Sequence, residues 1–131
     1  MTETTTSHVA EAVDRYLRFW NATPAEQRLT GSETFADGAT YTAPVGVLTG
    51  VEALADFTEQ FVSNVGAYRF RVREEPEINH NHARLKWEIR LGDTSFAEGT
   101  DVLTVDNAGR VTSVAAFVDR APATQPHHED H

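Results

Sequence analysis

Asp101 is the residue whose position in the sequence first suggests chemistry. It lies in residues 95–105, where polar and apolar residues alternate as in a β-strand, so that every second residue shares a face. The other residues on its face are small or apolar: Ala97, Gly99, Leu103 and Val105. A carboxyl group on such a face must be neutral, paired or both. Asp101 is therefore either a structural acid that is hydrogen-bonded at a hairpin or a functional acid that faces a ligand.

Two histidines raise the question of a metal site. His80 and His82 lie two residues apart in a predicted strand and so on one face, where they could bind a metal together with a carboxylate. Arg84 and Lys86 share that face and would repel a cation, so we expect contact with solvent or with a second copy of the chain. Three more histidines lie in a segment without periodicity, which is weak evidence for a site: His127, His128 and His131. We therefore expect no metal.

Several classes of chemistry are absent from the sequence. It contains no cysteine, which excludes disulfides, cysteine-bound zinc, iron–sulfur clusters and a cysteine nucleophile. It also contains no Ser-His-Asp order, phosphate-binding loop, dinucleotide fingerprint or HExxH pattern. We expect neither a cofactor nor a nucleophilic triad.

Composition and charge narrow the possible partners. The 131 residues are 40% hydrophobic and 24% charged, as in an ordinary globular domain, so we expect a single domain over residues 1–131 with an ordered core of about 7–122. The net charge of −9 is the wrong sign for binding nucleic acid or an anionic membrane. No apolar run approaches the roughly 20 residues that span a bilayer, and the amino-terminal stretch is Thr-rich without a basic apolar signal. These features predict a soluble, cytoplasmic protein with a flexible tail at 123–131.

Three helices are predicted before any long strand. Helical spacing of Val9, Val13, Tyr16 and Trp20 indicates an amphipathic helix that starts near His8. Residues 23–26 form a capping-box sequence with proline at the first helical position, which predicts a short helix that runs towards Phe35 and ends at residues 37–38. A second box at 49–52 predicts a third helix that ends at Gly66, with these residues inward: Leu54, Phe57, Phe61 and Val65.

The remaining sequence alternates with a period of two. After a short extended piece at 39–43, strands are predicted around residues 68–73 and 84–90, then at 95–105 and 111–119, with hairpin turns at 91–94 and 106–109. Helices followed by a run of strands indicate an α+β domain in which a curved, mostly antiparallel sheet packs on the helices.

The order of these elements and several short motifs resemble the nuclear transport factor 2-like superfamily, which includes ketosteroid isomerase, scytalone dehydratase and SnoaL-like polyketide cyclases. The motifs are Phe35-Ala36-Asp37-Gly38-Ala39-Thr40, then Pro44-Val45-Gly46 with Gly50, Asp101-Val102-Leu103, Asn107-Ala108-Gly109-Arg110-Val111, and Phe117-Val118-Asp119-Arg120-Ala121-Pro122. The resemblance covers most of the chain and implies a cone in which three amino-terminal helices pack in the concave face of the sheet.

The resemblance also implies a catalytic pair. The oxyanion-hole tyrosine and aspartic acid of ketosteroid isomerase fall on Tyr16 and Asp101, whose phenol and protonated carboxyl could both donate to one developing oxyanion. The general-base aspartate of that family falls on Ala43, before Pro44, and its buttressing tyrosine falls on Thr58. Without that base the usual proton shuttle cannot run. Either Asp101 is itself the acid/base, the substrate supplies the proton acceptor, or residue 43 has been altered from the natural one.

A mostly apolar ligand site is predicted between the helices and the sheet. The expected lining residues are Phe19, Trp20, Phe35, Ala43, Phe57, Phe61, Leu85, Trp87, Ile89, Val114, Ala116 and Val118. Alternatively, these residues only pack in the core, and Tyr16 is a core tyrosine whose hydroxyl is bonded to a backbone carbonyl. With the resemblance, the inventory favours a small cofactor-independent isomerase, cyclase or dehydratase acting on a hydrophobic polyketide- or steroid-like molecule. The competing hypothesis is a noncatalytic binding or dimerisation module that has lost the base.

The outer face of the sheet is predicted to be charged. Arg69, Arg71 and Arg73 form a basic row close in sequence to several acids, which indicates a solvated or salt-bridged face. The alternative is a homodimer through this face, which many relatives of the fold form.

Overall fold

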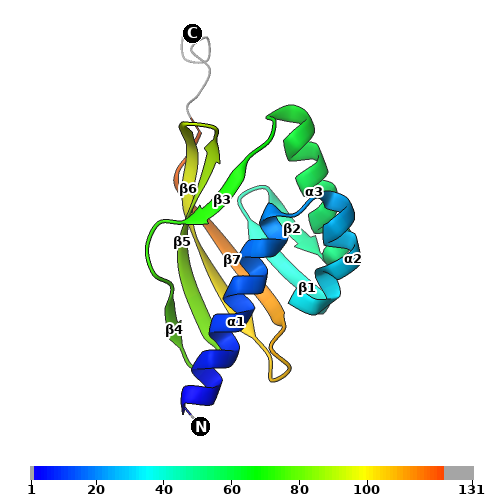
Figure 1. Cartoon of the computed structure of the whole chain (residues 1–131). Helices are drawn as coiled ribbons and strands as arrows, with labels where there is room; N and C mark the ends of the chain where they lie inside the picture. The colour runs from blue at the N-terminus through cyan, green and yellow to red at the C-terminus, as the bar shows by residue number, and fades with distance from the viewer. Residues whose placement is uncertain (1, 123–131) are drawn as a thin grey trace.

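In the described part of the chain, three helices lie on one side of a curved β-sheet (Figure 1). The computed structural model describes the backbone of residues 2–122 and the side chains of residues 8–122, so the tail predicted to be flexible, 123–131, lies outside the described residues. The helices are α1 (Thr2–Asn21), α2 (Pro24–Thr34) and α3 (Val51–Asn64). None of the described helices is long and apolar enough to span a bilayer.

The caps of α2 and α3 differ. At α2 the Thr23 hydroxyl accepts from the Glu26 N–H at 3.2 Å and the Glu26 carboxylate accepts from the Thr23 N–H at 3.0 Å, which confirms the predicted capping box. The box predicted for α3 is wrong, because Gly50 is the residue at the cap and no side chain bonds there. Thr49 is already paired with Thr40 in the sheet, so its backbone belongs to a strand.

The ends of α2 and α3 also correct the sequence analysis. Helix α2 ends at Thr34, because Phe35 already has extended dihedral angles and starts a strand. Asp37 and Gly38 lie inside this strand, where the pairing shifts register and Gly38 takes a φ of +70° that suits glycine. Val65, predicted to face the core, follows the last residue of α3 and is 37% exposed.

Seven strands form one sheet in the order β2-β1-β7-β6-β5-β3, with β4 paired to β5 beside this path. Every pairing is antiparallel except that of β1 with β7, which is parallel. Strands β2 and β4 are not among the predicted strands, because at four and three residues they are too short to show a clear alternation. The strands are β1 (Phe35–Ala43), β2 (Gly46–Thr49), β3 (Arg69–Val72), β4 (Glu77–Asn79), β5 (His82–Leu91), β6 (Thr94–Val105) and β7 (Val111–Arg120).

Register shifts bend the sheet around the helices. They occur in β5–β6 between Ile89 and Arg90, and in β6–β7 beside Gly99 and Val105. Such irregularities increase local twist and curvature. The concave face then packs on α1, with a fully buried core that includes Val9, Val13, Tyr16, Leu85, Leu103, Val105, Val111 and Val114. The predicted α+β cone is confirmed.

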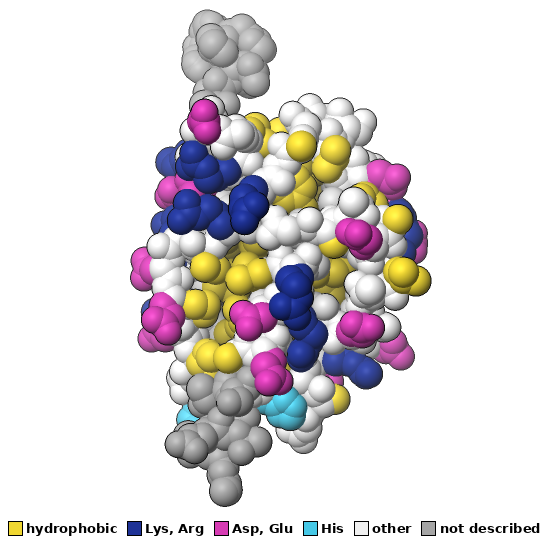
Figure 2. Space-filling model, viewed as in Figure 1, with side chains coloured by type: hydrophobic (Ala, Val, Ile, Leu, Met, Phe, Trp, Pro, Cys, Tyr) yellow, Lys and Arg dark blue, Asp and Glu magenta, His cyan; other side chains and the backbone are white. Residues whose placement is uncertain are grey.

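The convex face of the sheet carries ion pairs, as the alternating charges predicted. Arg73 bonds Asp119 at 2.9 Å and lies 3.5 Å from Glu98, while Arg71 lies 3.5 Å from Glu88. Figure 2, seen from the side of α1, shows dark blue basic side chains near β3, with magenta acidic ones beside them. The side chains of Glu88 and Arg73 are only 9% and 24% exposed, so these pairs are less screened by water than fully exposed pairs, which add little stability each. A homodimer through this face stays a prediction.

Candidate functional site

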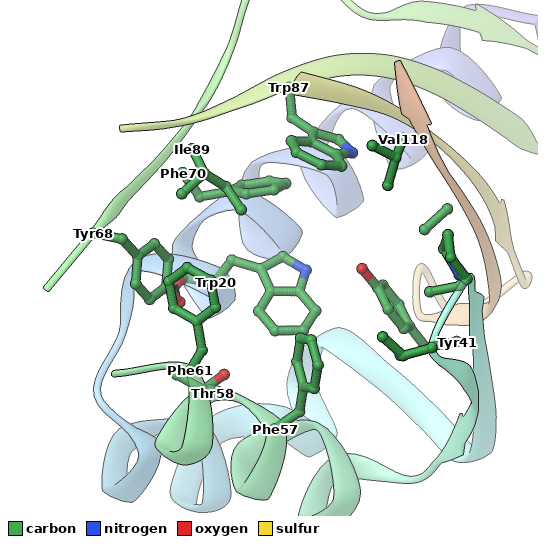
Figure 3. A pocket seen from close by; sticks show the side chains of 14 residues that line it. Trp20, Tyr41, Phe57, Thr58, Phe61, Tyr68, Phe70, Trp87, Ile89 and Val118 are labelled. Atoms are coloured by element: carbon green, nitrogen blue, oxygen red, sulfur yellow. Dashed lines mark hydrogen bonds between the residues drawn. The ribbon is translucent and has the colours of Figure 1, made fainter. Parts of the chain in front are cut away.

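A cavity of about 180 Å³ lies between the helices and the concave face of the sheet (Figure 3). Its lining is mostly aromatic and aliphatic, and none of the lining residues is an acid, a histidine, a lysine or an arginine. The lining residues are Trp20, Tyr41, Ala43, Pro44, Val45, Phe57, Thr58, Phe61, Tyr68, Phe70, Trp87, Ile89, Ala116 and Val118. A cavity of this kind suits an apolar molecule with few polar groups.

Regular spacing within each element places these side chains on one wall. Trp87 and Ile89 alternate along β5, and Ala116 and Val118 alternate along β7, so each pair faces the same side of the sheet. Helix α3 contributes residues one turn apart, which the helical period puts on one face: Phe57, Thr58 and Phe61. Figure 3 shows their side chains pointing towards the indole of Trp20 from α1.

Two polar groups of the lining are already bonded to the protein. The Tyr68 hydroxyl donates to the Trp20 carbonyl, and the Thr58 hydroxyl donates to the Leu54 carbonyl at 3.2 Å. Burial raises the pKa of Tyr68, so its hydroxyl stays protonated. Neither hydroxyl can donate to a ligand without giving up its present bond, although each can still accept one.

Tyr16 and Asp101 meet behind the cavity wall. The Tyr16 hydroxyl donates to Asp101 Oδ2 at 2.5 Å, and the Trp87 indole N–H donates to Asp101 Oδ1 at 2.7 Å. Tyr16 and Asp101 are both 0% exposed, and neither lines the cavity. The predicted pair is thus brought together, but its two members bond to each other, with Trp87 between Asp101 and the cavity.

Burial controls the protonation of both Asp101 and Tyr16. Removal from water raises the pKa of Asp101 to about 7, against the opposing effect of the two hydrogen bonds it accepts. Burial, followed by the charge of Asp101, raises the pKa of Tyr16 well above its usual range. The Trp20 indole N–H lies near the Tyr16 hydroxyl and partly offsets the rise in the pKa of Tyr16. No hydrogen bond of accepted geometry joins the two groups. Near neutral pH the Asp101 carboxyl is therefore divided between its acid and its carboxylate.

The structure separates the predicted ligand-contacting residues into two groups. Those on the cavity wall are Trp20, Ala43, Phe57, Phe61, Trp87, Ile89, Ala116 and Val118. Four others are buried in the core instead: Phe19, Phe35, Leu85 and Val114. Their helical or strand spacing predicted burial correctly, but none of the four lines this cavity.

Other lining residues were not foreseen as ligand contacts, namely Tyr41, Pro44, Val45, Thr58, Tyr68 and Phe70. Period-two spacing could have found Tyr68 and Phe70, which share the inward face of their strand segment with Val72. The same spacing links Tyr41 to Ala43. Ala43 lies on the cavity wall, so the position where the resemblance expects a general base is open to a ligand but carries a methyl group.

The two histidines do not share a strand face. His80 lies in the turn between β4 and β5 with a φ of +55°, whereas His82 begins β5, and both are exposed. The prediction that both lie on one strand is wrong, because the turn takes up residues 80–81. Within the described side chains, no three histidine, aspartate or glutamate residues gather closely enough to hold a metal ion. The other histidines singled out in the sequence, His127, His128 and His131, lie outside the described residues.

Residues 13–114 match the family model of the SnoaL-like domain. The chain belongs to the SnoaL-like family. Among solved structures, this SnoaL-like chain is similar to a proposed isomerase of the same family from Agrobacterium tumefaciens, at 25% identity and a TM-score of 0.77, covering 86% of this chain and 98% of that one. A search among curated proteins finds no significant match.

More distant likenesses of the SnoaL-like chain concern the fold alone. A proposed polyketide cyclase from Sinorhizobium meliloti is 18% identical with a TM-score of 0.64, covering 81% of this chain and 93% of that one. A de novo designed protein with a curved β-sheet is 17% identical with a TM-score of 0.66, covering 94% and 89%. Because a designed scaffold resembles the chain as closely as this proposed cyclase does, likeness of fold does not decide function, which has to be argued from the cavity.

Proposed function

We propose that this SnoaL-like protein binds a hydrophobic small molecule in the cavity between its helices and its sheet. The observation that carries the proposal is the lining itself, which is apolar and aromatic and contains no charged side chain. An apolar ligand gains about 25 cal/mol for each Å² that it removes from water. A molecule with a permanent charge would lose its hydration there without gaining a counterion.

The experiment is a titration with naphthalene, followed by the fluorescence of Trp20, which lies on the cavity wall. Ala116→Leu adds three carbons inside the cavity, whereas Ala115→Leu adds the same three on the opposite face of β7. Displacing about 60 Å² of ligand contact costs about 1.5 kcal/mol, or about tenfold in Kd. We expect this loss in Ala116→Leu only. Absence of saturable binding, or an equal loss in both variants, would refute the proposal.

A second candidate function is a cofactor-independent isomerase or cyclase that polarises a carbonyl or phenol oxygen of its substrate. The specific observation in its favour is Asp101, whose pKa of about 7 and hydrogen bond to Tyr16 suit proton exchange at neutral pH. The pair could reach a ligand only if the Trp87 indole turns away from Asp101. Such a substrate resembles the hydrophobic ligand of the first proposal but carries acidic C–H bonds next to its carbonyl.

Enzyme and binding module differ in one measurement. An enzyme that enolises a bound ketone exchanges the protons next to its carbonyl for deuterium in heavy water, which proton NMR follows directly. We expect Asp101→Asn and Tyr16→Phe to abolish this exchange, and Ala43→Asp to increase it by supplying a base on the cavity wall. If the native protein and Ala43→Asp both bind the ketone tightly but exchange its protons no faster than buffer does, the enzyme function is refuted and only the binding function remains.

A further inference from the structure

One hydrogen-bond donor of the cavity is buried without a partner. The indole nitrogen of Trp20 has no hydrogen bond among the described residues, and its side chain is 94% buried, since Trp20 is only 6% exposed. A buried donor without a partner destabilises the fold, because it has lost its hydrogen bond to water without gaining another. Trp87, the other tryptophan of the lining, has no such deficit because its N–H is bonded to Asp101 at 2.7 Å.

The Tyr41 hydroxyl lies beside this unpartnered N–H. Figure 3 shows the hydroxyl of Tyr41, from β1, directed into the cavity towards the nitrogen-bearing edge of Trp20, with no hydrogen bond drawn from it to the other lining residues. The two ring centroids are 5.5 Å apart. Burial, with the charge of Asp101 as a second cause, raises the pKa of Tyr41, so the hydroxyl remains a donor at every physiological pH. Two donors from different elements thus lie at one end of the cavity, where the Trp20 N–H is also near the Tyr16 hydroxyl behind the wall.

The electrostatics of this end exclude an anionic ligand. An acceptor that lies between the two donors could be a neutral carbonyl or a carboxylate. The lining has no lysine, arginine or histidine to balance a negative charge, and Asp101 lies just behind Trp87 with a charge of the same sign whenever it is ionised. The acceptor that fits is therefore neutral.

The size of the cavity limits the rest of the molecule. A cavity of roughly 150 Å³ lined by aliphatic and aromatic residues is known to hold benzene. The cavity of about 180 Å³ is slightly larger, and its flat aromatic walls include Phe57, Phe70 and Trp87. One ring or two fused rings fit inside, whereas a four-ring skeleton would have to protrude.

We propose that the cavity selects a neutral, flat molecule of one or two fused rings, and holds its carbonyl oxygen between the Trp20 indole N–H and the Tyr41 hydroxyl. This inference rests on the proposed binding function and adds the chemical class of the ligand and the two residues that recognise it.

The experiment compares three probes of nearly equal shape. In 2-acetylnaphthalene a carbonyl is attached to the rings, in 2-isopropenylnaphthalene a C=CH₂ group replaces C=O, and 2-naphthoate carries a negative charge. Two neutral hydrogen bonds are worth about 0.5–1.5 kcal/mol each, so we expect the ketone to bind about 5- to 150-fold more tightly than the hydrocarbon. The carboxylate should bind more weakly than either.

Two readouts assign the preference to the two donors. Tyr41→Phe should reduce the ketone-to-hydrocarbon ratio about three- to tenfold. Thr100→Val is the control, because it removes a hydroxyl that is bonded to Asp119 at 2.7 Å and does not line the cavity, and it should leave both affinities and their ratio unchanged. In ¹⁵N-labelled protein, the ketone should move the Trp20 indole N–H signal downfield, as expected for a new hydrogen bond, while the Trp87 signal moves less.

The outcomes separate the two proposals. Equal binding of ketone and hydrocarbon, or a Trp20 signal that responds equally to both, overturns the carbonyl site and leaves the hydrophobic binding function intact. Preferential binding of 2-naphthoate overturns the requirement for a neutral ligand. If none of the three probes binds, the carbonyl site and the proposed function fail together.

Discussion

Replacement of Asp101 by asparagine tests whether burial controls the protonation of this side chain. In the folded protein burial raises the pKa of Asp101 from 3.8 to about 7. Between these two values the folded state holds a proton that the unfolded chain has already released. Stability must therefore fall as pH rises through this window, and the loss is complete above the folded pKa. Asparagine cannot ionise, so this part of the pH dependence disappears in the variant.

The size of the effect follows from the two pKa values. A shift of about three units, at about 1.4 kcal/mol each, corresponds to about 4 kcal/mol over the whole titration. Between about pH 5 and about pH 8, the part that is measurable under mild conditions is about 2–3 kcal/mol. Other titrating groups are common to both proteins and cancel in the comparison.

The assay is urea unfolding followed by tryptophan fluorescence, at several pH values between these limits, for the native protein and Asp101→Asn. We expect the free energy of unfolding of the native protein to fall by about 2–3 kcal/mol more than that of the variant on going from the acidic to the basic limit. Two curves that stay parallel within about 0.5 kcal/mol would refute the reasoning, because Asp101 would then titrate at the same pH in the folded and unfolded chains.

Three further changes test the packing around the site. Gly99→Ala places a Cβ in the volume of the Trp87 indole, so we expect a loss of about 1–3 kcal/mol in urea unfolding and an altered fluorescence spectrum; an unchanged spectrum would contradict the close contact. Thr23→Ala removes the capping box of α2 and should cost about 1 kcal/mol, whereas no change in the urea midpoint would argue against the cap. Leu103→Ala, at 0% exposure, should cost about 2–5 kcal/mol, while Leu29→Ala, at 81% exposure, should stay within about 0.5 kcal/mol; similar losses would contradict the assigned core.

Much of the fold could be predicted from the sequence because local patterns specify it. The helical spacing around Tyr16, the capping box at Thr23 and the alternation through Asp101 each identify an element within one stretch of chain. Strand β1 was predicted only in part, over residues 39–43 and not from its first residue, Phe35. Its first residues follow α2 directly, and the register shift between Phe35 and Thr40 breaks the period of two that a sequence pattern would reveal.

The candidate site was harder to predict because it depends on contacts between distant segments. Sequence spacing could place Asp101 on an apolar face, but it could not show that Trp87 would occupy the second carboxyl oxygen and separate it from the cavity. Likewise, Phe19 and Trp20 are adjacent on α1, yet one is in the core and the other on the cavity wall. Which aromatic residue meets empty space is decided by packing between elements, and no single element encodes it.

The parallel pairing of β1 with β7 has a consequence for how the chain folds. Thr42 in the first strand pairs with Ala115 in the last strand. The hydrogen bond from Tyr16 to Asp101 also joins residues that are 85 positions apart. Folding that requires such long loops to close is slow, because the entropy of loop closure is lost before the stabilising contacts form. During synthesis α1 can pack on β3, β4 and β5 first, but the buried Tyr16 hydroxyl has no Asp101 partner until β6 has left the ribosome. We therefore expect slow, late consolidation, and a nascent chain that depends on protection from aggregation until its last strand arrives.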